Sequence, residues 1–276
     1  MIRAIGIDLD GTLLNDKKEI CQRNIEMIRK AQEKGIKIVL CSGRSADGMQ
    51  RELKALSLQT KGQYAVGLNG GIVFEADTGR LIYKNTMDPR DALQAIETGR
   101  KVFDTMNMQV YNGINTFVEH WDDTTDFYQK ATGSQPRLIP DAADLYQDVV
   151  KVGYFARGEF DYSLRKIRKL KEVLTGLLPQ DVSVAITAPY LVETYDRKTD
   201  KGRGMKILAE KLGLDRSEIM GIGDLENDMP LIEYAGFGVV MANGSQVMKE
   251  AADYITKDNN NEGGVAEAIE KYVLNR

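Results

Sequence analysis

Two acidic residues follow a short apolar segment at the start of the chain. Residues 4–7 (Ala-Ile-Gly-Ile) predict a buried strand, and Asp8 and Asp10 come directly after it. Because side chains alternate along extended backbone, these two carboxylates are expected on the same side of the chain. Two carboxylates held close together in a poorly solvated place repel each other, and a hard cation that takes oxygen ligands relieves the repulsion. The pair is therefore a candidate Mg²⁺ site.

A simple turn and a calcium-binding loop are two alternative interpretations of this stretch. An Asp-Gly-Thr sequence after a strand is also common turn chemistry, so the pair alone does not decide between a turn and a site. A calcium loop would place Asp8, Asp10 and Glu19 at its first, third and twelfth positions. That interpretation fails because Leu13 occupies the sixth position, where glycine is required, and because a strand precedes the loop instead of a helix.

Other apolar segments also end in polar residues. Strands are expected at 36–41, 64–68, 219–223 and 237–241, and they alternate with helical patterns near 19–34, 47–56, 203–212 and 229–234. This order predicts an α/β fold, a doubly wound parallel sheet with right-handed crossovers. Ligands bind beyond the carboxyl ends of such strands, so Ser42 and Asn69 should lie at the same sheet edge as Asp8. Asp224 and Asp228 would add two more carboxylates there, and this concentration favours a metal.

The middle of the chain follows a different pattern. A hairpin is expected from 72–74 and 81–83, and then a helix and two strands occur twice. The expected segments are a helix at about 88–106, strands at 109–111 and 116–121, a helix from near 124, a loop with Pro136 and Pro140, a strand at 149–155, a helix at 162–177, and strands at 182–187 and 190–195. We therefore expect a core domain of residues 1–84 and 194–276, with terminal helices at 246–252 and 264–273, and an inserted α+β cap domain of residues 85–193.

Composition limits the possible classes of protein. The chain has 276 residues, 42% of them hydrophobic and 28% charged, which is typical of a globular protein. Its net charge of −4 argues against a nucleic-acid partner or an anionic membrane surface. Cys21 and Cys41 form neither a metal-binding nor a redox spacing, and we see no leader or membrane-spanning segment, so a cytoplasmic location is expected. No pattern indicates an oligomeric state.

Taken together, the polar strand ends resemble the haloacid dehalogenase superfamily, specifically the type IIB, Cof-like sugar phosphatases. The matching segments, in order, are Ile7–Leu13, Cys41–Arg44, Lys201–Gly202 and Gly223–Asp228. The resemblance spans the whole chain, including the size and place of the inserted domain. Each motif is weak alone, but four in this order are specific.

The resemblance implies roles for three catalytic residues. Asp8, ionised at neutral pH, would attack phosphorus and form an aspartyl-phosphate. Asp10 would protonate the leaving oxygen and then activate water, a role that requires a raised pKa, which a nearby carboxylate can supply. Lys201 would pair with both the phosphate and the nucleophile; it is preferred to Lys198 because it directly precedes Gly202.

The resemblance also implies binding residues. Mg²⁺ would lie between Asp8, the backbone carbonyl of Asp10 and Asp224, with Asp228 as a further ligand or as support, while Glu226 would be solvated. The residues expected near the phosphate or the substrate are Thr12, Ser42, Gly43, Arg44, Asn69, Gly70 and Asn227.

Four further residues have no assigned role. Asn243 resembles a family asparagine, although the neighbouring residues depart from the family pattern. No motif covers Tyr111, Trp121 or His120; we expect the histidine on the surface and the aromatic rings in the core of the inserted domain.

These observations predict a Mg²⁺-dependent phosphatase that acts on a small phosphorylated metabolite, with sugar phosphates as the expected substrates. A phosphomutase would use the same aspartates, although a type IIB cap favours hydrolysis. A phospho-acceptor signalling domain of the receiver type explains neither the inserted domain nor Asp10. A binding protein that keeps the fold without turnover is the third alternative.

Overall fold

The computed structural model describes residues 1–102, 106–156 and 160–275, and these form two compact units. The first unit comprises Met1–Gly43, Gln50–Tyr83 and Asp200–Arg276, and the second comprises Arg44–Met49 and Lys84–Thr199. Among the described residues, no helix has the length and apolar character that crossing a bilayer requires.

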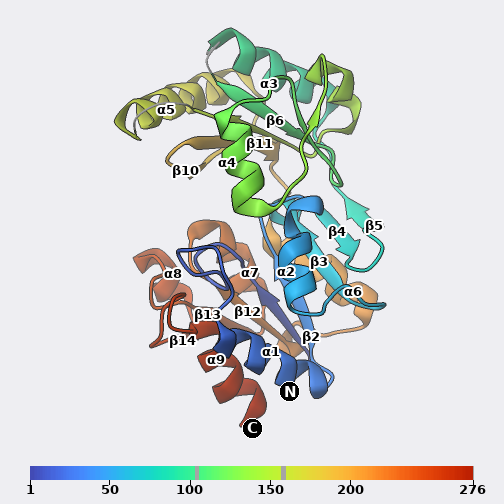
Figure 1. The fold of residues 1–276 in the computed structure, drawn as a ribbon, viewed down its shortest axis with the longest axis vertical. Coiled ribbons are helices and arrows are strands. Elements are labelled where there is room, and N and C mark those ends of the chain that lie inside the picture. The colour runs from blue at the N-terminus through green and yellow to red at the C-terminus, as the bar shows by residue number, and fades with distance from the viewer. Residues whose placement is uncertain (103–105, 157–159, 276) are drawn as a thin grey trace. The chain divides into compact units, whose positions relative to one another are not determined.

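The first unit is built on an eight-stranded sheet (Figure 1). In spatial order its strands are β14 (Tyr254–Ile255), β13 (Phe237–Val240), β12 (Ile219–Gly223), β1 (Ala4–Ile7), β2 (Lys37–Cys41), β3 (Tyr64–Gly67), β4 (Ile72–Glu75) and β5 (Leu81–Lys84). The strands from β14 to β3 are parallel, and β4 is antiparallel to β3. The chain runs outward from β1 toward β5 and later from β12 toward β14, so its direction of winding reverses between β1 and β12.

Helices cover both faces of this sheet. On one face α6 (Lys201–Leu212) and α7 (Met229–Tyr234) pack against each other and bury Met205 and Leu231 against strand residues such as Val39. On the other face α1 (Gln22–Glu33) packs on α9 (Gly264–Ile269). The unit also contains the short helices α2 (Gln50–Ala55) and α8 (Gln246–Ala251). This arrangement confirms the predicted doubly wound α/β fold class.

In the part of the second unit that the structure describes, there are a six-stranded sheet and three helices. In spatial order its strands are β10 (Val182–Ala188), β11 (Leu191–Asp196), β9 (Lys151–Phe155), β6 (Asn107–Tyr111), β7 (Thr116–Val118) and β8 (Arg137–Leu138), and only the β7–β8 pair is parallel. Helices α3 (Pro89–Val102) and α5 (Phe160–Leu177) cover one face through Ile96 and Ile167. On the opposite face lies α4 (Asp123–Thr132), whose Tyr128 ring packs edge-on against Tyr111, with 6.3 Å between ring centroids.

Some elements differ from those expected. Strand β8 and a 3₁₀ turn at Ala142–Asp148 occupy the expected Pro136–Pro140 loop and the residues after it, and β14 was not predicted; two-residue strands are too short to show a hydrophobic period. Helix α6 begins at Lys201, two residues earlier than expected, because Asp200 caps it by accepting a hydrogen bond from the Arg203 amide. The helix expected to end near residue 106 is described as far as Val102; residues 103–105 lie outside the described residues, and Met106 is not helical.

Short turns connect the other elements. The remaining 3₁₀ turns are Asp47–Met49, Leu68–Gly70, Arg216–Glu218 and Glu226–Asp228, and the last helix continues as a π turn at Glu270–Leu274.

The expected burial of Trp121 is wrong: its side chain is 47% exposed, because the ring donates a hydrogen bond from Nε1 to Asp126 (2.8 Å) at the surface. Tyr111 is buried as expected, and His120 is exposed.

Gly70 and Gly79 provide a matched test of how closely the first unit is packed. Both have positive φ angles, 95° and 71°, but a Cβ atom on Gly70 would lie 1.8 Å from the Asp200 carbonyl oxygen, whereas one on Gly79 meets nothing within 4 Å. We expect Gly79→Ala to cost about 1–2 kcal/mol from backbone strain alone. Gly70→Ala should cost at least about 2 kcal/mol more, because the start of α6 must move. Urea unfolding of both variants would measure this difference, and equal losses would contradict it.

Candidate active site

The site begins at the reversal of winding between β1 and β12. Ile7 pairs with Ile222, and the Asp8 amide donates to the Ile222 carbonyl (3.0 Å), so the two strands stay paired up to the acidic residues. Asp8 and Asp224 follow these neighbouring strands, and each is only 5% exposed. The topology therefore brings together two carboxylates that are more than 200 residues apart in sequence.

A buried lysine lies between two of the carboxylates. Lys201 Nζ is 2.5 Å from Asp8 Oδ1 and 2.5 Å from Asp228 Oδ1, and its side chain is fully buried. Lys198, the alternative considered from sequence, is exposed and belongs to the second unit. The geometry thus favours Lys201 as the residue that neutralises charge at Asp8.

Close backbone approach fixes this lysine. Because Gly70 has no side chain, its backbone can approach the Asp200 carbonyl closely. Gly202 likewise lies close to the Pro230 carbonyl, where a Cβ atom would be only 2.1 Å from the oxygen. Both contacts lie at the first turn of α6, so they fix the position of Lys201, the first residue of that helix, against Asp8 and Asp228.

Asp224 and Asp228 are oriented by hydrogen bonds. Asp228 Oδ2 accepts from the Asp224 amide (2.9 Å), and the Thr12 hydroxyl donates to Asp224 Oδ1 (3.0 Å). Thr12 is fully buried, and in this structure its hydroxyl orients the Asp224 carboxylate; its expected role in phosphate binding stays a prediction. The Asp228 side chain also packs against Gly223, where a Cβ atom would lie 2.4 Å away.

The three carboxylates form a cluster that could hold a metal ion. One oxygen from each of Asp8, Asp224 and Asp228 lies within 4.8 Å of the others. Burial, followed by repulsion from Asp228, raises the pKa of Asp8 well above its usual range, and Lys201 opposes the rise. Burial and Asp228 raise the pKa of Asp224 to about 7. Burial lowers the pKa of Lys201, but the two carboxylates beside it overcome this and raise it.

One ammonium therefore faces three buried carboxylates, which leaves an excess of negative charge. A divalent cation with oxygen ligands would remove that excess and restore the ionised form of Asp8 expected from the sequence. The donor set and its charge thus fit a hard cation.

Asp10 lies outside this cluster. Its side chain is 41% exposed, and Oδ1 accepts an ion-paired hydrogen bond from Lys18 Nζ at 2.7 Å. Nothing in the sequence indicated this contact of Lys18, a residue that also has a left-handed backbone (φ 61°).

The residues expected to bind phosphate and substrate occupy neighbouring strand ends. The Asn69 amide donates to the Ser42 carbonyl (2.9 Å), and the Asn69 side chain packs on Gly43, where a Cβ atom would lie 3.1 Å from Oδ1. Asn69 is buried in a left-handed conformation, and its Oδ1 has no hydrogen-bond partner among the described residues. This oxygen could accept a hydrogen bond from a ligand hydroxyl.

Other residues of the motifs take different positions. Arg44 is buried and belongs to the short segment grouped with the second unit. Asn227 and Glu226 are exposed on the turn after β12, which agrees with the expected solvation of Glu226. Cys41 is a free, buried thiol whose pKa burial raises to about 12, so it is no nucleophile.

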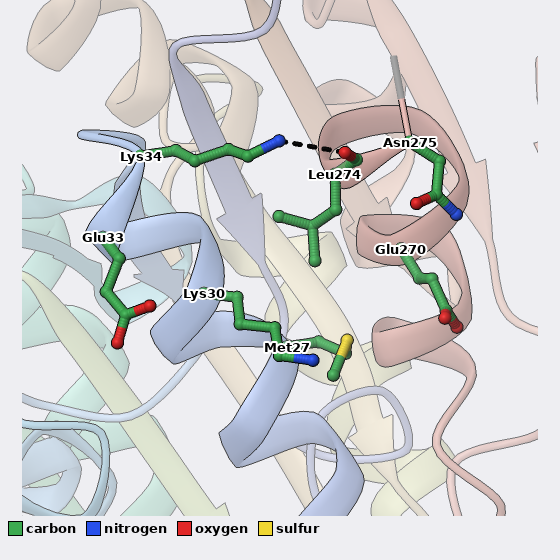
Figure 2. A pocket seen from close by; sticks show the side chains of 7 residues that line it. All are labelled: Met27, Lys30, Glu33, Lys34, Glu270, Leu274 and Asn275. Atoms are coloured by element: carbon green, nitrogen blue, oxygen red, sulfur yellow. Dashed lines mark hydrogen bonds between the residues drawn. The ribbon is translucent and has the colours of Figure 1, made fainter.

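A separate cavity of about 330 Å³ lies away from these residues (Figure 2). It is lined by Met27, Lys30, Glu33, Lys34, Glu270, Leu274 and Asn275. Lys34 Nζ donates to the Leu274 carbonyl (2.9 Å), so this lysine ties α1 to the C-terminal turn. The cavity contains none of the candidate site residues.

A doubly wound sheet with acidic residues at its switch point is typical of α/β proteins that bind a ligand there, and comparison with known proteins identifies the family. The model of the haloacid dehalogenase-like hydrolases matches residues 5–269. The chain is 31% identical to the 5-amino-6-(5-phospho-D-ribitylamino)uracil phosphatase YcsE of Bacillus subtilis, over 99% of this chain and 96% of the relative. The chain belongs to this family and is an enzyme of the phosphatase class.

Solved structures agree with this assignment. A haloacid dehalogenase-like hydrolase from Bacteroides thetaiotaomicron superimposes with a TM-score of 0.87 at 32% identity, covering 98% of this chain and 99% of that one. A subclass IIB sugar phosphatase shares the fold at 19% identity, with a TM-score of 0.81 and 98% of both chains covered.

Replacing the buried lysine should be costly. In Lys201→Met the Asp8 and Asp228 carboxylates lose their buried counter-ion, so we expect a loss of about 3–5 kcal/mol in unfolding free energy without divalent metal. Lys198→Met, an equal change at an exposed position, should stay within about 0.5 kcal/mol of wild type. Chemical denaturation of both variants in EDTA measures this. Similar stabilities would show that Lys201 does not neutralise the cluster.

The pKa of Asp224 gives a prediction about pH. In the folded protein the pKa of Asp224 is raised to about 7, so the folded state keeps a proton at pH values where the unfolded chain has released it. The stability that Asp224 contributes is therefore lost as pH rises from its ordinary pKa through about 7. In EDTA, Asp224→Asn should therefore melt roughly 3 °C or more above wild type at pH 8, and the difference should be smaller at pH 5, where less of this stability has been lost.

Addition of Mg²⁺ should reverse that order at pH 8, since the cation stabilises wild type and has lost a ligand in the variant. Thermal melting at the two pH values, with and without Mg²⁺, checks both effects. A variant that responds to Mg²⁺ as wild type does would remove Asp224 from the metal site.

Proposed function

We propose that this enzyme hydrolyses small phosphate monoesters, in particular sugar phosphates, through an aspartyl-phosphate on Asp8 and with Mg²⁺ as its cofactor. The observation that carries the proposal is the contact between Asp8 and the buried ammonium of Lys201, 2.5 Å apart at the switch point of the sheet. A carboxylate held beside a fixed cation is positioned both to attack phosphorus and to share its charge with the phosphoryl oxygens.

The reaction would proceed in two steps. In the first, an oxygen of Asp8 bonds to phosphorus while the ester P–O bond breaks, and the leaving oxygen takes a proton from Asp10. In the second, the Asp10 carboxylate removes a proton from water, which attacks phosphorus and releases Asp8 together with inorganic phosphate. Lys201 remains protonated throughout, because Asp228 and Asp8 raise its pKa.

The residues that would hold Mg²⁺ are Asp8, the Asp10 carbonyl, Asp224 and Asp228. When bound, the cation would offset the charge of the phosphoryl oxygens and of the carboxylate cluster. Ser42, Thr12 and Asn227 would bind phosphate oxygens, while Gly43, Arg44, Asn69 and Gly70 would lie near the rest of the substrate.

Two observations support a hydroxylated substrate. The Bacillus relative is named for a substrate with a phosphorylated ribityl chain, and the buried, unbonded Asn69 Oδ1 could accept a hydrogen bond from a hydroxyl group. The inserted domain, placed from sequence at residues 85–193, would select the leaving group and exclude water.

Hydrolysis of p-nitrophenyl phosphate tests the nucleophile and the metal. Activity should require Mg²⁺ and be lost with EDTA, and Asp8→Asn should reduce kcat at least about 1000-fold because the amide cannot form the phospho-enzyme. Glu226→Gln is the matched control, since this exposed acid follows the same sheet edge. Persistent activity in Asp8→Asn would overturn the nucleophile, and full activity in EDTA would overturn the metal.

A panel of phosphorylated metabolites tests the substrate class and the reaction. We expect kcat/KM for sugar and sugar-alcohol phosphates to exceed that for phosphoamino acids and nucleotides, with free phosphate as product. An isomeric sugar phosphate in place of free phosphate would identify a phosphomutase.

A further inference from the structure

Asn243 connects the loop after β1 to the C-terminal part of the first unit. Its Nδ2 donates to the Gly11 carbonyl (2.8 Å), and its Oδ1 accepts from the Asn260 amide (3.0 Å). The side chain is exposed, yet both ends of its amide are hydrogen-bonded. One amide therefore fixes the residue that directly follows Asp10.

Asn260 extends this connection into the interior. It is only 6% exposed, and its Nδ2 donates to the Leu14 carbonyl (3.1 Å) and to Asp16 Oδ1 (3.2 Å). Asn261 adds a second bond to Asp16, from Nδ2 to Oδ2 (3.2 Å). Gly11, Leu14 and Asp16 of the loop are thus held by the side chains of Asn243, Asn260 and Asn261.

The segment that carries Asn243 also holds the second acidic loop. The Met241 amide donates to the Gly223 carbonyl (3.0 Å), and the Ser245 amide donates to the Asp224 carbonyl (3.0 Å). The two loops touch at Gly11, where a Cβ atom would lie 2.3 Å from Asp224 Oδ2. Asn243 therefore belongs to a segment bonded both to the Asp10 loop and to the Asp224 loop.

We propose that Asn243, supported by Asn260, is a positioning residue that holds the Asp10 loop in register with Asp8 and Asp224. This inference rests on the proposed function, because it assigns the loop's geometry to the step in which Asp10 gives a proton to the leaving oxygen. Small displacements of a catalytic group reduce its rate contribution strongly, whereas the nucleophile itself, carried by β1, stays in place.

The expected signature is dependence on the leaving group. An alkyl phosphate such as a sugar phosphate needs a proton on its leaving oxygen, whereas p-nitrophenolate leaves without one. Since kcat/KM reports the first irreversible step, formation of the phospho-enzyme, loss of positioning should lower kcat/KM for the alkyl ester and largely spare the aryl ester. A general loss of structure would lower both alike.

The experiment measures kcat/KM for both esters in four variants at saturating Mg²⁺, with melting temperatures alongside. Asn243→Ala and Asn260→Ala remove the connection at its two ends. Asn243→Asp can still accept from the Asn260 amide but presents an oxygen to the Gly11 carbonyl. Gln32→Ala is the control, because it removes a comparable amide-to-carbonyl bond, from Gln32 to Leu56 (3.3 Å), elsewhere in the same unit.

We expect Asn243→Ala, Asn243→Asp and Asn260→Ala to lower the alkyl-to-aryl ratio of kcat/KM on the order of tenfold. Gln32→Ala should leave this ratio unchanged. Equal losses on both esters, or an unchanged ratio in both Asn243 variants, would overturn the positioning role while leaving the proposed function intact. Wild-type protein without activity on either ester, or undiminished activity in Asp8→Asn, would instead overturn both.

Discussion

A single buried ammonium facing three buried carboxylates is the constraint on which the rest of the first unit depends. Lys201 contacts both Asp8 and Asp228, and without it these carboxylates would lie uncompensated in the protein interior. Because one positive charge does not balance three negative ones, the pKa of Asp224 stays raised, and the site attracts further positive charge. The same imbalance that costs stability in the metal-free protein prepares the site for a cation and for phosphoryl chemistry.

The fold supplies this arrangement by bringing backbone unusually close to the charged groups. Glycine at positions 11, 70 and 223 leaves room where a side chain would collide with Asp224, with the Asp200 carbonyl or with Asp228. Two of these glycines belong to the motifs that resemble the family, so the motifs record close packing as well as chemistry. Parallel pairing of β1 with β12 then sets the distance between the two acidic loops.

The fold class and the main acidic residues could be predicted because apolar segments that end in carboxylates are local signals. The choice of Lys201 rests instead on the resemblance of Lys201–Gly202 to a family motif. Other features depend on contacts between distant segments or on backbone conformation. No periodic pattern in the sequence indicates the left-handed backbone of Lys18, the hydrogen bond from Thr12 to Asp224 or the hydrogen bond from Asn243 to Gly11. Trp121 was expected in the core, but a polar partner for its indole keeps the ring at the surface. Neither β8 nor β14 is long enough to show alternation.

The most direct measurement of the central claim is the location of the phosphoryl group on the enzyme during turnover. Acid quenching within a single turnover of a sugar phosphate, followed by proteolysis and mass spectrometry, should find one phosphorylated peptide with the modification on Asp8. With p-nitrophenyl phosphate, whose leaving group needs no proton, the aspartyl-phosphate should be more abundant in Asp10→Asn than in wild type, because only the second step then needs Asp10, as a base. Phosphate on another residue, or turnover with no phospho-enzyme at any quench time in this variant, would contradict the role given to Asp8.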